Sequence, residues 1–217
     1  MDFFSNGAMP MGALFFGLMV LGVVRRKTGS AVARAQYPKL GERLGLTYTT
    51  SNYKGGVGKL QGTLAGYRVT VDPDDQRRIY VRFDSEPQLE LHSFVHNKRS
   101  PSGTRAFRPA SPVLAAQFKT AHASPAIIER LNRASGLSEA LRPLRFLRAL
   151  KTLSASPQGI TAVFDYGNPP YIPAEVVDDV LPRLLGLARV IEGSDAEGGA
   201  AAFELAALEE SPAESED

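Results

Sequence analysis

The pattern of apolar and polar positions begins with a long apolar stretch. Between Phe3 and Val24 the chain has no charged residue, and the 17 positions of Ala8–Val24 are apolar except for glycines and Pro10. In a helix these positions would span roughly 25 Å, close to the roughly 30 Å hydrocarbon core of a bilayer. The pattern therefore predicts a transmembrane helix within residues 1–27.

The charges that flank this stretch predict its orientation. Only Asp2 precedes it, whereas Arg25, Arg26, Lys27 and Arg34 follow it. The positive-inside rule then places the N-terminus outside and the rest of the chain in the cytoplasm, as a single-pass protein of the inner (cytoplasmic) membrane. Two alternatives remain open, namely an exported protein cleaved near Ala31–Ala35 and a buried N-terminal core helix.

The next region alternates between apolar and polar residues, as half-buried strands do. Apolar residues recur at every second position from Tyr67 to Val71 and from Ile79 to Phe83. Turn-forming sequences separate the segments at 52–56, 65–66 and 72–76. Residues 47–96 are therefore predicted to form an antiparallel meander of four or five strands, preceded by a short helix at 37–46.

The remaining apolar residues recur mainly at helical spacing. A helix is predicted from Ser124, followed by Pro125, to Gly136, and a second helical stretch begins at Ser138. A hairpin is expected around 156–159, and an amphipathic helix over 174–191 closes the core. The predicted fold class is α+β, in which an N-terminal transmembrane helix precedes an antiparallel β-meander with packed helices.

Charge divides the chain more clearly than its overall balance of +2 indicates. Residues 192–217 hold nine of the 23 acidic residues and no basic residue, which leaves all 25 basic residues and 14 acidic ones in 1–191, a net charge of +11. The acidic tail is expected to be disordered, apart from an apolar island at Phe203, Leu205 and Leu208. We expect it to cover basic surface at 130–151 or 98–108 transiently.

These patterns predict four segments. Residues 1–27 form the anchor with its basic flank, 28–35 a juxtamembrane linker, 36–192 the α+β domain and 193–217 the acidic disordered tail. The polar, basic stretch 96–112 is expected to be a mobile loop within the domain.

One glycine-rich string invites a nucleotide-binding interpretation. Lys54–Lys59 (KGGVGK) resembles the deviant phosphate-binding loop of the ParA/MinD family of ATPases. That loop needs a preceding buried strand, a hydroxyl residue after the second lysine and a helix that follows. Here Leu60 replaces the hydroxyl residue and the sequence that follows is strand-like, so a hairpin turn is favoured.

No other constellation predicts a reaction. The chain has no cysteine, and His92 and His96 lie on a strand-like segment where they would stand about 13 Å apart. We expect no metal, no cofactor and, on balance, no enzymatic activity.

Two segments are candidate binding surfaces. Arg142, Arg145, Arg148 and Lys151 recur every three residues, each after a leucine, and on a helix they would form a slanting basic ridge for an anionic surface. The segment 166–173 (YGNPPYIP) is a rigid loop in which Tyr166, Asn168 and Tyr171 are the candidate contacts of a partner-binding loop.

The chain is similar in architecture to bacterial proteins that join one N-terminal span to a small α+β domain. This resemblance rests on Arg25–Lys27, the strand meander and Phe118–Leu131, and it assigns no functional residue. We therefore expect a membrane-anchored, cytoplasmic-facing binding or scaffold module with a protein partner and anionic lipid contact, and no nucleic-acid partner. The alternatives are an ATPase that uses Lys54–Lys59 and an exported periplasmic binding domain.

Overall fold

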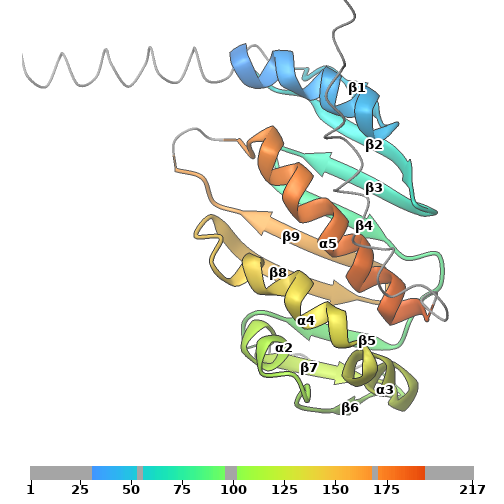
Figure 1. The fold of residues 1–217 in the computed structure, drawn as a ribbon. Coiled ribbons are helices and arrows are strands. Elements are labelled where there is room, and N and C mark those ends of the chain that lie inside the picture. The colour runs from blue at the N-terminus through green and yellow to red at the C-terminus, as the bar shows by residue number, and fades with distance from the viewer. Residues whose placement is uncertain (1–30, 53–55, 96–101, 168–170, 194–217) are drawn as a thin grey trace, which may run out of the picture.

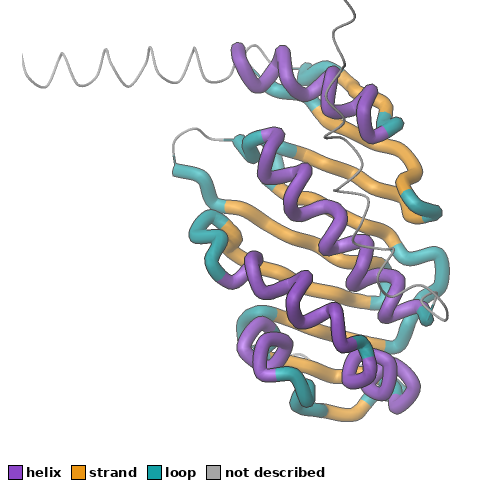
Figure 2. Tube along the Cα trace, viewed as in Figure 1, coloured by secondary structure: helices purple, strands orange, loops and turns teal. Residues whose placement is uncertain are grey.

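The computed structural model describes residues 31–52, 56–95, 102–167 and 171–193, and it shows an antiparallel sheet with helices on one face (Figures 1 and 2). The nine strands lie in the order β1-β2-β3-β4-β9-β8-β5-β7-β6. The α+β, antiparallel part of the predicted fold is thus confirmed. The helices and strands have the following bounds: residues 31–44 (helix), β1 Thr47–Thr49, β2 Lys59–Leu64, β3 Tyr67–Asp72, β4 Arg78–Arg82, β5 Leu89–His92, β6 Arg105–Ala106, α2 Pro112–Gln117, β7 Thr120–Ala123, α3 Pro125–Arg133, α4 Ser135–Leu141, η1 Arg142–Arg145, β8 Leu150–Ser156, β9 Gly159–Phe164 and α5 Ala174–Glu192.

The predicted transmembrane helix is not supported by the structure. Within the described ranges, no helix combines the length and the apolar character that a membrane crossing requires. The longest described helix, α5, has 19 residues, and six of them are charged. The membrane-spanning part of the fold class and the single-pass inner-membrane location are therefore corrected, because the one described helix of sufficient length packs on the sheet. The predicted span itself, residues 1–27, lies outside the described residues.

The first described helix begins before the predicted position. Residues 31–44 are helical, including 31–35, which we expected to belong to a linker. The reason is an apolar stripe in which Ala33, Tyr37 and Leu40 are all buried at helical spacing. The Tyr37 hydroxyl donates a hydrogen bond of 2.7 Å to the carbonyl of Ile172, which ties this helix to the loop before α5.

The predicted meander is confirmed for β1 to β4, which pair in sequence order. The fifth strand departs from it: β4 pairs with β9, whereas β5 lies between β8 and β7. The hairpin of β8 and β9 thus enters the centre of the sheet and separates strands that are close in sequence. The part of the expected 96–112 loop that the structure describes contains β6, and α2 begins at its last residue, Pro112.

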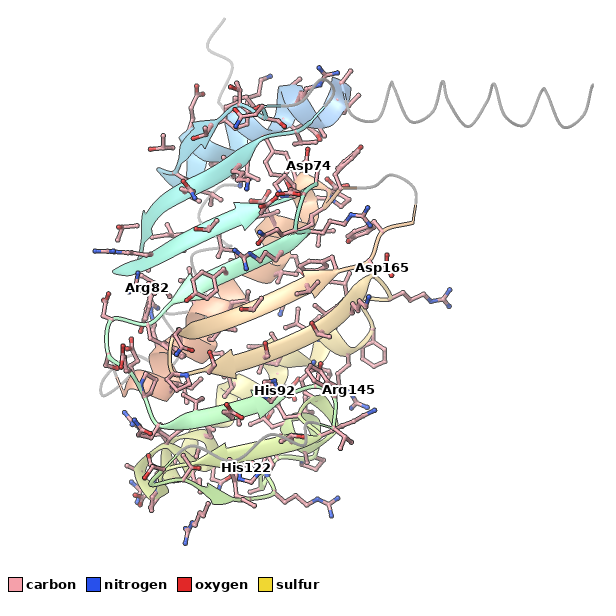
Figure 3. The ribbon with its side chains drawn as sticks, turned by 180° about the vertical axis from the view of Figure 1, so that it is seen from behind. Asp74, Arg82, His92, His122, Arg145 and Asp165 are labelled. Atoms are coloured by element: carbon pink, nitrogen blue, oxygen red, sulfur yellow. The ribbon has the colours of Figure 1, made fainter. Side chains whose placement is uncertain are left out.

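The core lies between the sheet and its helices (Figure 1). On the sheet side it contains the alternate residues of the strands, such as Val69, Val81 and Leu153, all nearly inaccessible to solvent. On the helix side α5 buries Val177, Leu181 and Leu184, as the amphipathic spacing predicted. The other face of the sheet is polar and carries no helix of the described chain (Figure 3).

Candidate functional site

A groove of about 220 Å³ opens where the end of β5, the end of α2, η1 and the start of β8 meet. Its lining combines two cations and two neutral polar side chains with alanine and leucine residues. The lining includes Ser93, Gln117, Leu144, Arg145, Leu147 and Lys151. Of the predicted basic series, the structure therefore brings Arg145 and Lys151 together.

The backbone of 142–150 creates this convergence. The expected basic helix over 141–151 is wrong, because α4 ends at Leu141 and only one 3₁₀ turn, η1, follows before the chain enters β8. Leu144 is buried, and the amide of Leu150 donates a hydrogen bond of 2.9 Å to the carbonyl of Leu147. These turns reverse the chain, so that Arg145 and Lys151 face one groove instead of following one helix face.

Lys151 occupies a bulge in β8. Leu150 is opposite Phe164 and Thr152 is opposite Val163, so Lys151 has no partner residue on β9. A bulge leaves one residue outside the ladder and redirects its side chain. This irregularity explains how a strand residue contributes an exposed ammonium group to the groove.

The neutral polar groups come from β5 and α2. The amide of Ser93 donates a hydrogen bond of 2.9 Å to the Leu153 carbonyl, and the Ser93 hydroxyl accepts one of 3.0 Å from the Leu153 amide. Gln117 ends α2 and is only 7% exposed, which is unusual for a side-chain amide. Both side chains are thus held in place by backbone that is itself well packed.

The groove is positively charged. Among the described residues, Arg145 and Lys151 make no ion pair, whereas Arg142 pairs with Glu139 at 2.6 Å. The lining contains no acidic residue and no histidine. The arrangement can hold an anion, but it offers no general base and no ligand set for a metal.

Exposed apolar residues follow two of the lining residues in sequence. Phe146 follows Arg145 and is 75% exposed, while Phe94 and Val95 follow Ser93 and are also exposed. Exposed apolar residues beside a polar cavity are typical of interaction sites. A ligand that suits this groove therefore combines a negative charge with an apolar group.

The other predicted site residues lie elsewhere. Arg142 and Arg148 do not line the groove, and both are exposed. The Tyr166 ring stacks on Phe164 with centroids 6.2 Å apart, and burial raises the pKa of its hydroxyl. Burial also raises the pKa of Tyr171, and Asn168 lies outside the described residues. Both tyrosines pack against the core, so a separate partner-binding loop stays a prediction.

The glycine-rich string does not have the geometry of a phosphate-binding loop in its described part. Lys59 opens β2, a strand, where such a loop needs a helix. Its ammonium group is paired with Asp72 at 2.8 Å. Residues 53–55 lie outside the described residues.

Metal binding has no support either. Within the described ranges, no cluster of three or more histidine, aspartate or glutamate side chains has a geometry suited to a metal ion. On the polar face of the sheet, the Nε2 atom of His92 lies 3.7 Å from the Oε2 atom of Glu90. His96 lies outside the described residues.

Sequence reasoning missed Ser93, Gln117 and the bulge at Lys151. A buried glutamine at the end of a six-residue helix has no local signature, and the groove forms from three stretches of the chain, at residues 93, 116–117 and 144–151. No family model, curated protein or solved structure compared with this chain matches it.

Proposed function

We propose that this protein is a non-enzymatic binding module whose basic groove holds an acidic, partly apolar segment of a protein partner. The observation that carries the proposal is the convergence of Arg145 and Lys151, neither of which is ion-paired in the described chain, on one groove beside the exposed ring of Phe146. Cations without a counter-charge form a favourable site for a carboxylate, and Gln117 and Ser93 add neutral polar groups.

The shape of the groove favours a protein segment over a lipid surface. A volume of about 220 Å³ suits one or two side chains that enter a concavity. A bilayer surface instead attracts clusters of basic residues on an exposed face, at about 1 kcal/mol for each residue near the surface. Arg145 and Lys151 converge inside a groove, and they do not spread over a flat face.

The test is a binding titration that follows the fluorescence anisotropy of a labelled peptide of alternating glutamate and leucine. The double substitution Arg145→Gln/Lys151→Gln is expected to weaken binding about tenfold, as loss of two partly exposed charge contacts would do. The matched control is Arg133→Gln/Arg142→Gln, which makes the same change in net charge at two exposed arginines paired with Glu129 and Glu139.

Three results would contradict the proposal. Equal weakening by both double substitutions would show that only net charge matters. Undiminished peptide binding by Arg145→Gln/Lys151→Gln would place the site elsewhere. The third result uses vesicles that contain phosphatidylserine. If the protein binds these vesicles but not the peptide, and Arg145→Gln/Lys151→Gln alone weakens the vesicle binding, the groove contacts lipid and the protein-segment proposal is wrong.

A further inference from the structure

No helix of the described chain covers the polar face of the sheet (Figures 1 and 3). Its side chains follow the strand register in rows across the sheet. One continuous row is entirely polar: Thr47, Gln61, Thr70, Tyr80, Thr161, Ser154, His92 and Thr120. Such a face is hydrated when it is free, and it offers many hydrogen-bonding groups to an extended chain laid across it.

A neighbouring row contains two arginines that directly oppose each other. Arg68 of β3 is paired in register with Arg82 of β4, and both are exposed. Like charges directly opposite each other on neighbouring strands are destabilising. Neither arginine makes an ion pair with any described residue, although the exposed Asp84 follows Arg82 by two positions.

The surroundings leave these guanidinium groups accessible. Beyond Arg82 the row continues with Gly159, which has no side chain, and beyond Arg68 it continues with Thr63. Asp72 is four residues along β3 from Arg68, roughly 13 Å away, and its buried carboxylate is paired with Lys59. The pair therefore forms a positive site without an internal counter-charge in the described chain.

The last helix, α5, ends close to the chain segment that follows Arg82. The Glu192 carboxylate accepts hydrogen bonds from the backbone amide of Ser85, at 2.9 Å, and from its hydroxyl, at 2.5 Å. Ser85 lies three residues after Arg82, and Gly193 ends α5 in the left-handed region with φ of 80°. The last described residues therefore lie beside the end of β4 that carries Arg82.

The segment that follows has the complementary charge and sufficient length. Residues 194–217 contain eight acidic residues and no basic one. At no more than about 3.3–3.6 Å for each residue, 24 residues can reach up to roughly 80 Å, which exceeds the roughly 10 Å between packed layers. Tethering at this distance gives the acids a high effective concentration at the open face.

We infer that the acidic C-terminal segment, residues 194–217, docks on the open face of the sheet at Arg68 and Arg82. The docked segment supplies the carboxylates that neutralise the two opposed arginines. The inference is independent of the basic groove. Neither Arg68 nor Arg82 lines the groove, and Figure 3 shows Arg82 and Arg145 on opposite sides of the sheet.

Disulfide trapping in the full chain tests this docking, because the chain contains no cysteine of its own. Thr63→Cys, at an exposed position opposite Arg68, is combined with Ala207→Cys in the acidic segment. The initial rate of intramolecular disulfide formation under a mild oxidant then reports how often the segment visits the open face. Addition of salt should lower this rate, because screening weakens exposed charge contacts.

In this background Arg68→Gln/Arg82→Gln should lower the rate about fivefold, which is equivalent to about 1 kcal/mol. Arg68→Lys/Arg82→Lys should retain most of the rate because it keeps both charges, and it also guards against a folding defect. The control Arg133→Gln/Arg142→Gln should leave the rate unchanged. An unchanged rate in Arg68→Gln/Arg82→Gln overturns the inference, and so does an equal loss in the control. A loss confined to Arg145→Gln/Lys151→Gln overturns it as well, by assigning the segment to the groove.

Discussion

The ammonium group of Lys59 lies 2.8 Å from the Oδ2 atom of Asp72, a carboxylate whose side chain is only 2% exposed. The other carboxylate oxygen of Asp72 accepts hydrogen bonds of 3.2 Å from the backbone amides of Asp75 and Gln76. The turn between β3 and β4 is thus organised around one buried carboxylate. Lys59 has a structural role here, which accounts for its place in a glycine-rich string without a phosphate-binding loop.

We predict that Asp72→Ala lowers the free energy of unfolding by about 2–3 kcal/mol, because it removes the counter-charge of Lys59 and the acceptor of two amides. Urea denaturation at neutral pH measures this loss. The matched control, Asp75→Ala, removes an exposed aspartate 3.9 Å from Lys59 and should change stability by less than about 0.5 kcal/mol. Similar losses for both substitutions would show that the turn does not depend on Asp72.

Tyr37 should make the folded state sensitive to alkaline pH. Burial raises the pKa of its hydroxyl far above the ordinary value of 10.0, and nearby acids such as Asp74 add to the shift. A raised pKa means that this contribution to stability is complete below pH about 10 and is lost as the pH rises above it, where only the unfolded state ionises freely.

Denaturation at a series of pH values tests this expectation. Tyr37→Phe should flatten the decline in stability above pH about 10 and should cost about 1 kcal/mol at neutral pH through loss of the bond to Ile172. The hydrogen bond to Asp72 also raises the pKa of Lys59, which contributes in the same direction. Lys59→Met in the same series separates the two groups. A slope that Tyr37→Phe leaves unchanged would argue against the role of Tyr37.

Gly159 should tolerate no side chain. Its φ is 153°, and a Cβ atom built there would lie 2.3 Å from the carbonyl oxygen of Val81 on the neighbouring strand. Because that oxygen belongs to a central strand, we expect Gly159→Ala to cost at least about 2 kcal/mol. Gly167→Ala is the control, since its Cβ would meet no atom within 4 Å. Equal melting temperatures for the two variants would refute the prediction.

Substitutions at Phe146 and Leu144 should affect peptide binding and folding stability differently. Phe146 is 75% exposed, so Phe146→Ser should change the unfolding free energy by less than about 0.5 kcal/mol yet weaken binding of the acidic peptide. Leu144 is 2% exposed, so Leu144→Ala should cost about 2–5 kcal/mol. Paired denaturation and anisotropy measurements check both. Unchanged peptide affinity in Phe146→Ser would remove this ring from the proposed site.

Local patterns in the sequence determined most of the individual elements. Alternation at Tyr67, Val69 and Val71 predicted β3, and the apolar spacing from Val177 to Ile191 predicted α5. Ser124 before Pro125 placed the start of α3. Each of these signals lies within one element, because side-chain periodicity follows directly from the backbone geometry of a strand or a helix.

Only the tertiary structure decided which elements are neighbours and which cations converge. The series from Arg142 to Lys151 looked helical, but pairing of β8 with β9 draws its last residues into the sheet. The opposition of Arg68 and Arg82, fourteen positions apart, depends on the register of β3 with β4. The groove at Arg145 and Lys151 depends on β5 leaving the meander to pair with β8. Strand pairing is a long-range choice made by burial across the whole sheet, so no local pattern contains it.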